Sequence, residues 1–203
     1  MSISRIIALA SALIATAASV QAADDAALPG RSGAILNQIM NRISIQTDDW
    51  FHDGAYLRSV QGQKMLVAYN PQDLESYHLA AWLLWSSGRP DEAQDVYHSA
   101  LRANPQSWET PFEMGMHWTG RRDYNQAAIW FTHSVLRGGP PKCWKMLAHS
   151  YSRLGYLETA LGIFQYLVPM APDDPAVPLN IERLQKMIAE RDNPTGEGET
   201  PQE

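Results

Sequence analysis

Residues 141–173 read PKCWKMLAHSYSRLGYLETALGIFQYLVPMAPD, and this stretch carries the clearest periodic pattern in the chain. Its first half has apolar side chains at the spacing of one helix face, namely Trp144, Leu147, Ala148 and Tyr151. Gly155 follows as a helix breaker. A second helical face comes next, with Ala160, Phe164 and Leu167 before Pro172. The stretch therefore predicts two helices joined by a tight turn.

The same landmarks recur along the chain at an interval of thirty-four residues. This interval separates Pro71 from Pro105, and it also separates Gly54 from Gly88. A fixed period of this length is typical of repeat proteins. One helical repeat of this size cannot bury its apolar face alone, so it gains stability by stacking on its neighbours. We therefore predict an all-α chain, built as a curved stack of helix pairs whose inner surface is open to partners.

The landmarks of residues 141–173 resemble those of the tetratricopeptide repeat, both in residue type and in spacing. They are Trp144, Leu147, Ala148, Tyr151, Gly155, Ala160, Phe164 and Pro172. The resemblance covers about residues 40–173. It implies a right-handed αα-superhelix of stacked helix hairpins, in which the first helix of each hairpin lines a concave groove. It also implies that the protein binds a peptide or protein segment.

The two middle windows match this pattern to different degrees. Residues 74–107 keep the register of the small, aromatic and proline positions. In residues 108–140, Arg122 stands where the turn glycine is expected, so the conformation of that turn stays open. The sequence Gly138-Gly139-Pro140 also replaces the usual ending of the repeat.

The first repeat is divergent. Residues 40–73 have Ser59 and Gln63 at positions that usually hold small and aromatic packing residues. Terminal repeats often differ in this way, because one of their faces has no neighbour. The predicted segments, in order, are a signal peptide at 1–22, a flexible leader with the start of the first helix at 23–39, the divergent repeat at 40–73, repeats at 74–107, 108–140 and 141–173, a capping helix at 174–192 and a disordered tail at 193–203.

A single helix is predicted to close the array. Asp174 can cap a helix that begins at Pro175. The apolar residues of this helix form one stripe, which consists of Val177, Ile181, Leu184 and Ile188. One apolar face and one polar face suit a helix that covers the last hairpin. A membrane-surface helix is the alternative, but it would need a cationic face, and the charges here are balanced.

The N-terminus has the composition of a secretory signal. Arg5 precedes a stretch of apolar or small residues at 6–20, and small residues at Val20 and Ala22 suit cleavage before Ala23. We therefore expect an exported protein, periplasmic or extracellular. An uncleaved membrane anchor is the alternative, although the stretch is shorter than the roughly 20 apolar residues that span a bilayer.

Composition excludes several classes of function. The formal net charge of −6 argues against nucleic-acid binding, which requires clustered lysine and arginine. The single cysteine, Cys143, cannot form a disulfide within the chain, and we expect it to be buried between helices. A redox role or an intermolecular disulfide at Cys143 remains the alternative.

No pattern of catalytic or metal-binding residues stands out. None of the six histidines lies three or four residues from another histidine, as a helical metal site would require. The sequence has no nucleophile elbow, phosphate loop or dinucleotide fingerprint. We therefore predict no cofactor, no metal and no enzymatic activity.

The groove positions of the family can be projected onto this chain. They give nine candidate partner-binding residues, namely His78, Trp82, Trp85, Phe112, Met116, Lys142, Lys145, His149 and Arg153. The same projection adds Glu75 and Glu109, and from the divergent repeat Asn41, Asp48, Phe51 and His52. The predicted groove has an aromatic floor and a basic end.

The two tryptophans of the second repeat can each be read in two ways. Either ring could pack between repeats, as aromatic residues at helical spacing commonly do. We expect Trp85 to be the more exposed of the two, because Ala81 and Leu84 occupy the inward positions. An exposed aromatic patch usually marks an interaction site.

The function expected from the sequence is that of an exported scaffold or assembly factor. Its partner is a protein or peptide segment held in the concave groove. We expect no nucleic-acid partner and no stable membrane insertion after signal cleavage, and a homo-oligomer stays open. One alternative is a small-ligand or glycan-binding module that uses the groove aromatics, and a second is an enzyme without a recognisable motif.

Overall fold

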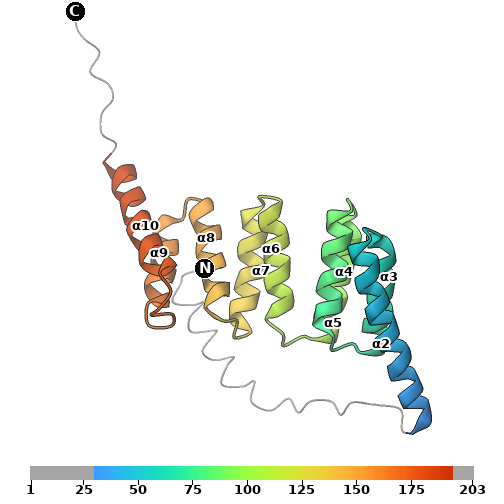
Figure 1. Ribbon diagram of the computed structural model, residues 1–203. Coiled ribbons are helices and arrows are strands. Elements are labelled where there is room, and N and C mark those ends of the chain that lie inside the picture. Colours follow the sequence, from blue (N-terminus) through green and yellow to red (C-terminus); the bar gives the residue numbers. More distant parts are fainter. Residues whose placement is uncertain (1–29, 194–203) are drawn as a thin grey trace, which may run out of the picture. The chain divides into compact units, whose positions relative to one another are not determined.

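The structure is a computed structural model that describes residues 30–193, and within this range it contains nine α-helices and no strand (Figure 1). The helices are α2 (Arg31–His52), α3 (Tyr56–Tyr69), α4 (Leu74–Ser86), α5 (Pro90–Ala103), α6 (Glu109–Gly120), α7 (Tyr124–Leu136), α8 (Pro141–Arg153), α9 (Leu157–Leu167) and α10 (Ala176–Asp192). The predicted all-α architecture of helix hairpins is confirmed. The predicted signal peptide, most of the leader and the tail after residue 193 lie outside the described residues.

The described residues divide into two compact units, 30–113 and 114–193, and the boundary falls inside α6. In the first unit, α3 packs on both α2 and α4, and α4 packs on α5. In the second unit, α8 packs on both α7 and α9, and α10 packs on α9. Each unit is thus a series of neighbouring antiparallel helices in chain order. No helix of 30–193 is long and apolar enough to cross a membrane.

The two helices of the first hairpin pack against each other through polar and small residues, which explains the divergent sequence of this repeat. Ser59 and Gln63 are both buried, and the Ser59 hydroxyl donates a hydrogen bond to the Thr47 carbonyl at 3.1 Å. A Cβ atom on Gly62 would collide with Cγ2 of Thr47, so only glycine fits where α2 and α3 approach. Small size and hydrogen bonding replace the alanine and aromatic contacts of the other repeats.

The second unit has the apolar core that the sequence predicts. Ala148 on α8 and Ala160 and Phe164 on α9 are fully buried. Cys143 is also fully buried, and the Ser134 hydroxyl donates to its sulfur at 3.1 Å. The expectation of a buried cysteine is therefore confirmed.

The turns between paired helices share one backbone conformation. Gly54, Gly88 and Gly155 have φ angles of 73°, 76° and 83°. Arg122 has a φ angle of 59°, so the third hairpin makes the same left-handed turn without glycine. The question that the sequence left open at Arg122 is thereby answered.

Helix α10 covers the end of the last hairpin. Its residues Val177 and Leu184 are buried, and α10 packs on α9. Oδ1 of Asp174 accepts a hydrogen bond from the Ala176 N–H at 3.0 Å, at the first helical residue. Asp174 therefore satisfies one of the backbone donors that a helix N-terminus leaves open, as the sequence suggested.

Candidate functional site

The nine candidate groove residues divide between the two units. The first unit contains His78, Trp82, Trp85 and Phe112, and the second contains Met116, Lys142, Lys145, His149 and Arg153. The two sets differ in their chemistry, since the first is mainly aromatic and the second mainly basic. Each set also has its own surroundings within its unit.

Trp82 is the exposed tryptophan of α4, and the expectation for Trp85 was wrong. Trp82 exposes 47% of its surface, whereas Trp85 is half-buried. Trp85 follows Ala81 by four residues, which places it only about 40° around the helix from a buried position. Trp82 instead shares the exposed arc of α4 with Glu75, seven residues earlier.

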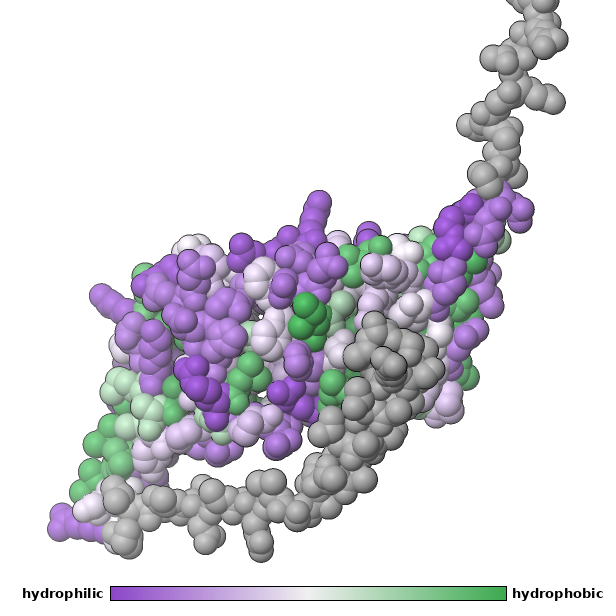
Figure 2. Space-filling model, turned by 180° about the vertical axis from the view of Figure 1, so that it is seen from behind, coloured by the Kyte–Doolittle hydropathy of each residue, from purple (hydrophilic) through white to green (hydrophobic). Residues whose placement is uncertain are grey.

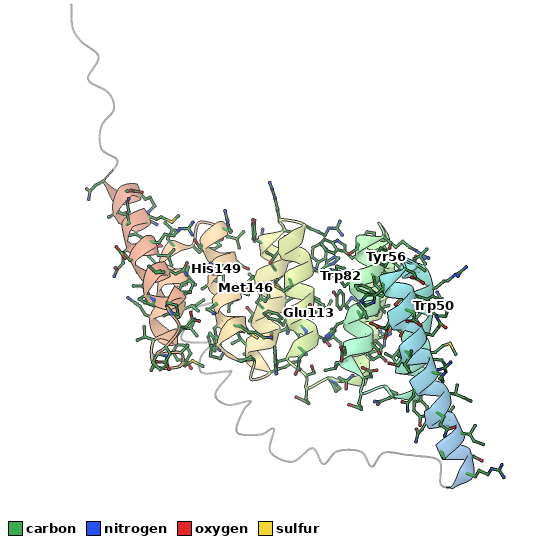
Figure 3. The ribbon with its side chains drawn as sticks, viewed as in Figure 1. Trp50, Tyr56, Trp82, Glu113, Met146 and His149 are labelled. Carbon is green, nitrogen blue, oxygen red and sulfur yellow. The ribbon has the colours of Figure 1, made fainter. Side chains whose placement is uncertain are left out.

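Three aromatic rings from α2, α3 and α4 form a cluster. The Phe51 ring lies 6.4 Å from the Trp82 ring and 6.0 Å from the Tyr56 ring, between centroids. Figure 3 shows Tyr56 and Trp82 close together on the first unit. These spacings are typical of favourable aromatic contacts. We call Phe51, Tyr56 and Trp82 the aromatic cluster.

Tyr56 was missed by the sequence reasoning. It is the first residue of α3, and the projection considered only the first helix of each hairpin. Its position directly after the turn at Gly54 brings it back over the end of α2. Tyr56 is 43% exposed, so it extends the aromatic surface that Trp82 begins.

An acidic groove adjoins the aromatic cluster. It has a volume of about 490 Å³ and lies between α2, the end of α3 and the start of α4. Asn41, Asp48, Phe51 and Glu75, all groove positions in the projection, are among its lining residues. Phe51 belongs to both the groove and the aromatic cluster, so the two form one continuous surface.

The charge of this groove is negative. Asp48, Asp73 and Glu75 line it, and no lysine or arginine is among its lining residues in the described chain. Asp73 is partly engaged, because its Oδ1 accepts from the Ser76 N–H at 3.0 Å and caps α4. His52 lies beside the groove with Nδ1 3.0 Å from the Asp48 carbonyl oxygen. That hydrogen bond, with the nearby Asp48 carboxylate, raises the pKa of His52.

His78 does not present a free surface to the groove. Its Nε2 lies 3.0 Å from the Thr110 hydroxyl of α6, and the ring is half-buried. Burial lowers the pKa of His78 to about 4, so the imidazole is neutral at pH 7. Phe112 is also half-buried, with its ring 6.2 Å from that of Trp108. Both residues contribute to helix packing in the first unit.

In the second unit, Lys145 is engaged in an ion pair. Its Nζ lies 2.5 Å from Oδ2 of Asp174, which holds the start of α10 against α8. Lys142 and Arg153 are exposed, and Met116 exposes 40% of its surface. The sequence could not reveal the Lys145–Asp174 contact, because it depends on how α10 returns to α8.

Basic side chains of the second unit lie near one another around His149. It is half-buried, with its ring 5.3 Å from that of Phe164. Burial lowers the pKa of His149, and the positive charges of Arg183, Lys145 and Arg153 lower it further. Arg183 on α10 was not among the candidates, because the projection ended with the last hairpin.

These side chains form no arrangement suited to metal binding. Among residues 30–193, no three His, Cys, Asp or Glu side chains are grouped so that they could hold a metal ion. The strongly shifted histidine, His78, contacts a threonine hydroxyl within a helix interface. The exposed features are an aromatic cluster, an acidic groove and a group of basic side chains, which all suit binding.

Comparison with known families agrees with this architecture. The tetratricopeptide repeat model matches residues 74–107, which hold α4 and α5. Residues 74–107 therefore form a tetratricopeptide repeat (TPR), and the chain has the fold of TPR proteins. No curated protein sequence is significantly similar to it.

Solved structures of TPR proteins share its fold. The thermophilic TPR protein TTC0263 of Thermus thermophilus is 19% identical, with a TM-score of 0.55 over 72% of this chain and 81% of that chain. The pilF protein of Pseudomonas aeruginosa is 13% identical, with a TM-score of 0.59 over 76% of this chain and 71% of that chain. MamA from Desulfovibrio magneticus RS-1 is 14% identical, with a TM-score of 0.59 over 76% of this chain and 88% of that chain. At these identities the likeness concerns the fold alone. The tetratricopeptide repeat matched at residues 74–107 indicates a protein-interaction or scaffold module.

Proposed function

We propose that this protein is an exported interaction module that binds a cationic protein segment on its first unit. The segment lies along the acidic groove and places one side chain against the aromatic cluster. The observation that carries this proposal is the exposure of Trp82 beside Phe51 and Tyr56, at the end of a groove lined by carboxylates. Exposed aromatic surface of this kind usually marks an interaction site.

The charge of the groove selects the class of segment. Asp48 and Glu75 attract lysine and arginine, and the groove offers no cation among its described lining residues to repel them. A lysine or arginine that reaches Trp82 also gains a cation–π contact with the indole ring. Asn41 and Asn70 add hydrogen-bonding groups for a peptide backbone. We therefore expect a segment with basic residues and at least one apolar anchor.

Selection from a random peptide library, with the full chain as bait, tests the proposal. The selected peptides are expected to be rich in lysine and arginine, and their affinity falls as salt rises. Glu75→Gln and Asp48→Asn weaken binding, because each removes a groove carboxylate. Asp91→Asn is the matched control, since Asp91 is an exposed carboxylate on α5 outside the groove. Equal losses for Asp91→Asn and Glu75→Gln would contradict the proposal.

Export is supported by the N-terminal sequence. The stretch 6–20 consists of apolar or small residues and is followed by small residues before Ala23. N-terminal sequencing of the protein purified from its native cells is expected to give Ala23 as the first residue. A chain that begins at Met1 or Ser2 in a membrane fraction would contradict export with cleavage.

A glycan or small ligand is the second candidate for the same surface. An exposed indole beside hydrogen-bonding side chains also suits stacking on a sugar ring, as for Trp82 with Asn41 and Asp48 nearby in the groove. An array of oligosaccharides, measured with the same variants, separates the two candidates. Saturable sugar binding that Trp82→Ala abolishes, without peptide binding, would favour this second candidate.

A further inference from the structure

A second groove lies on the outer side of α2, away from the acidic groove. It has a volume of about 580 Å³ and is lined by α2 and by Gly62 and Met65 of α3. Four of its apolar residues expose between 47% and 56% of their surface, namely Ile35, Ile39, Ile45 and Met65. Figure 2 shows hydrophobic surface gathered at the N-terminal end of α2. Apolar surface of this extent on the adjoining helices α2 and α3 indicates an interface.

The α2 side of this outer groove has the spacing of a helix-pairing seam. Its residues follow one another at alternating steps of four and three, namely Ile35, Ile39, Arg42, Gln46 and Asp49. Such spacing keeps side chains on one side of a helix along its length and allows a second helix to pack there. The acidic groove uses Asn41, Ser44 and Asp48, which lie on the opposite side of α2.

Two opposite charges on this seam identify the helix that fits it. Arg42 and Asp49 are both exposed, and neither forms an ion pair with another residue of 30–193. They lie two turns apart, which is about 10 Å along the helix. When two copies of α2 pack antiparallel about a point between Ile45 and Gln46, each Arg42 meets the Asp49 of the other copy. A parallel pair would instead place like charges together.

We infer that the outer groove is a homodimer interface, in which the α2 helices of two copies pack antiparallel about a two-fold axis near Ile45 and Gln46. The arrangement is self-complementary, as a two-fold interface requires, and it makes the Arg42–Asp49 ion pair twice. Ile39 of each copy then lies against the last turn of α2 in the other copy and becomes covered, whereas Ile35 reaches just past the end of that helix at His52. The acidic groove, on the opposite side of α2, stays open in this dimer.

The test is the mass of the full chain, measured by light scattering and sedimentation over a range of concentrations. The wild-type protein is expected to be a dimer. Arg42→Glu and Asp49→Arg should each weaken the dimer by about tenfold or more, because each replaces two attractive contacts with two repulsive ones. Lys64→Glu, on the other side of α3, is the matched control and should leave the dimer unchanged.

Restoration of the dimer tests the register itself. The double variant Arg42→Glu with Asp49→Arg recovers the ion pairs and should dimerise like the wild-type protein. An equimolar mixture of the two single variants should form a heterodimer. In that heterodimer the two substituted side chains face each other as an ion pair, and the unchanged Arg42 of one chain faces the unchanged Asp49 of the other.

Two results would overturn the proposal. One is a wild-type chain that stays monomeric at every concentration. The other is a failure of both the double variant and the mixture to restore the dimer, which would leave the groove to a different occupant.

Discussion

The ammonium group of Lys145 lies 2.5 Å from Oδ2 of Asp174, and this contact joins the middle of α8 to the start of α10. The second carboxylate oxygen of Asp174 accepts the Ala176 N–H, so one side chain caps α10 and anchors it. The hydrogen bond from Lys145 lowers the pKa of Asp174, followed by the effect of the Ala176 N–H. A residue projected to bind a partner therefore holds the terminal helix in place.

Lys145→Gln should loosen α10. Amide hydrogens of α10 are expected to exchange faster in this variant, and also in Asp174→Asn, because each change removes one partner of the ion pair. Because the two side chains act through each other, the α10 amides of the double variant should exchange no faster than those of the less stable single variant. Additive effects would show that the two side chains act independently.

Acid should loosen the same helix. The folded-state pKa of Asp174 is below its ordinary value, so the contact contributes stability above that ordinary value. The contribution is lost as the pH falls through the lowered pKa, where the carboxylate takes up a proton. Exchange of α10 amides should accelerate in that range for the wild-type protein, and Asp174→Asn should not show this acceleration.

Arg122→Gly should stabilise the protein by about 0.5 to 1 kcal/mol. The left-handed backbone at Arg122, with a φ angle of 59°, is strained for a residue with a Cβ atom and relaxed for glycine. Gly155→Ala is the reciprocal change at the equivalent turn. A Cβ on Gly155 would have no neighbour within 4 Å. The expected loss of about 1 kcal/mol of unfolding free energy in Gly155→Ala therefore comes from the backbone conformation alone. Urea unfolding gives the free energy of unfolding of both variants. A lower free energy of unfolding for Arg122→Gly than for the wild-type protein would contradict backbone strain at Arg122.

His78 should make the protein less stable in mild acid. Its pKa is about 4 in the folded state and close to 6.5 when exposed, so the unfolded chain binds the proton first as the pH falls. Stability is therefore lost between about pH 6.5 and 4, by roughly 3 kcal/mol at most. His78→Gln should reduce the slope of unfolding free energy against pH in this window.

Ala160→Trp should destabilise the second unit strongly. Ala160 is fully buried on α9, where it packs against α8, and added volume there costs about 1 to 3 kcal/mol or more. Ala189→Trp, at an exposed position on α10, should have little effect. Thermal melts that fall equally for the two variants would show that the register of the last repeat is wrong.

The repeat architecture could be predicted from the sequence because its signals are local. The alanine, aromatic and proline spacing of residues 74–107 and 141–173 fixes which faces of each helix are apolar. The turn at Arg122 could not be predicted, since a non-glycine residue reaches that conformation only when the two flanking helices impose it. The local sequence pattern therefore predicts the helices, but it does not determine the conformation of every turn between them.

The candidate site was predicted less well, because exposure depends on neighbouring helices. The order of Trp82 and Trp85 was reversed, because Ala80 and Leu83 are buried along with Ala81 and Leu84, and this wider buried face of α4 depends on the helices that pack against it. Tyr56 joins the aromatic cluster only through the return of α3 over α2. The carboxylates of the acidic groove, by contrast, lie at positions that the family projection gives for Asp48 and Glu75.

The affinity of the selected peptides for Trp82→Ala and for Ile129→Ala, measured side by side, decides whether the aromatic cluster binds the partner. Trp82 and Ile129 are equally exposed, at 47% and 48%, so both variants should stay folded, and Trp82→Ala should lose mainly the ring contact with Phe51. Trp82→Ala is expected to weaken binding by about tenfold or more, as for an aromatic anchor, and Ile129→Ala to leave it unchanged. Unchanged affinity for Trp82→Ala, with both proteins folded, would contradict the proposed binding surface.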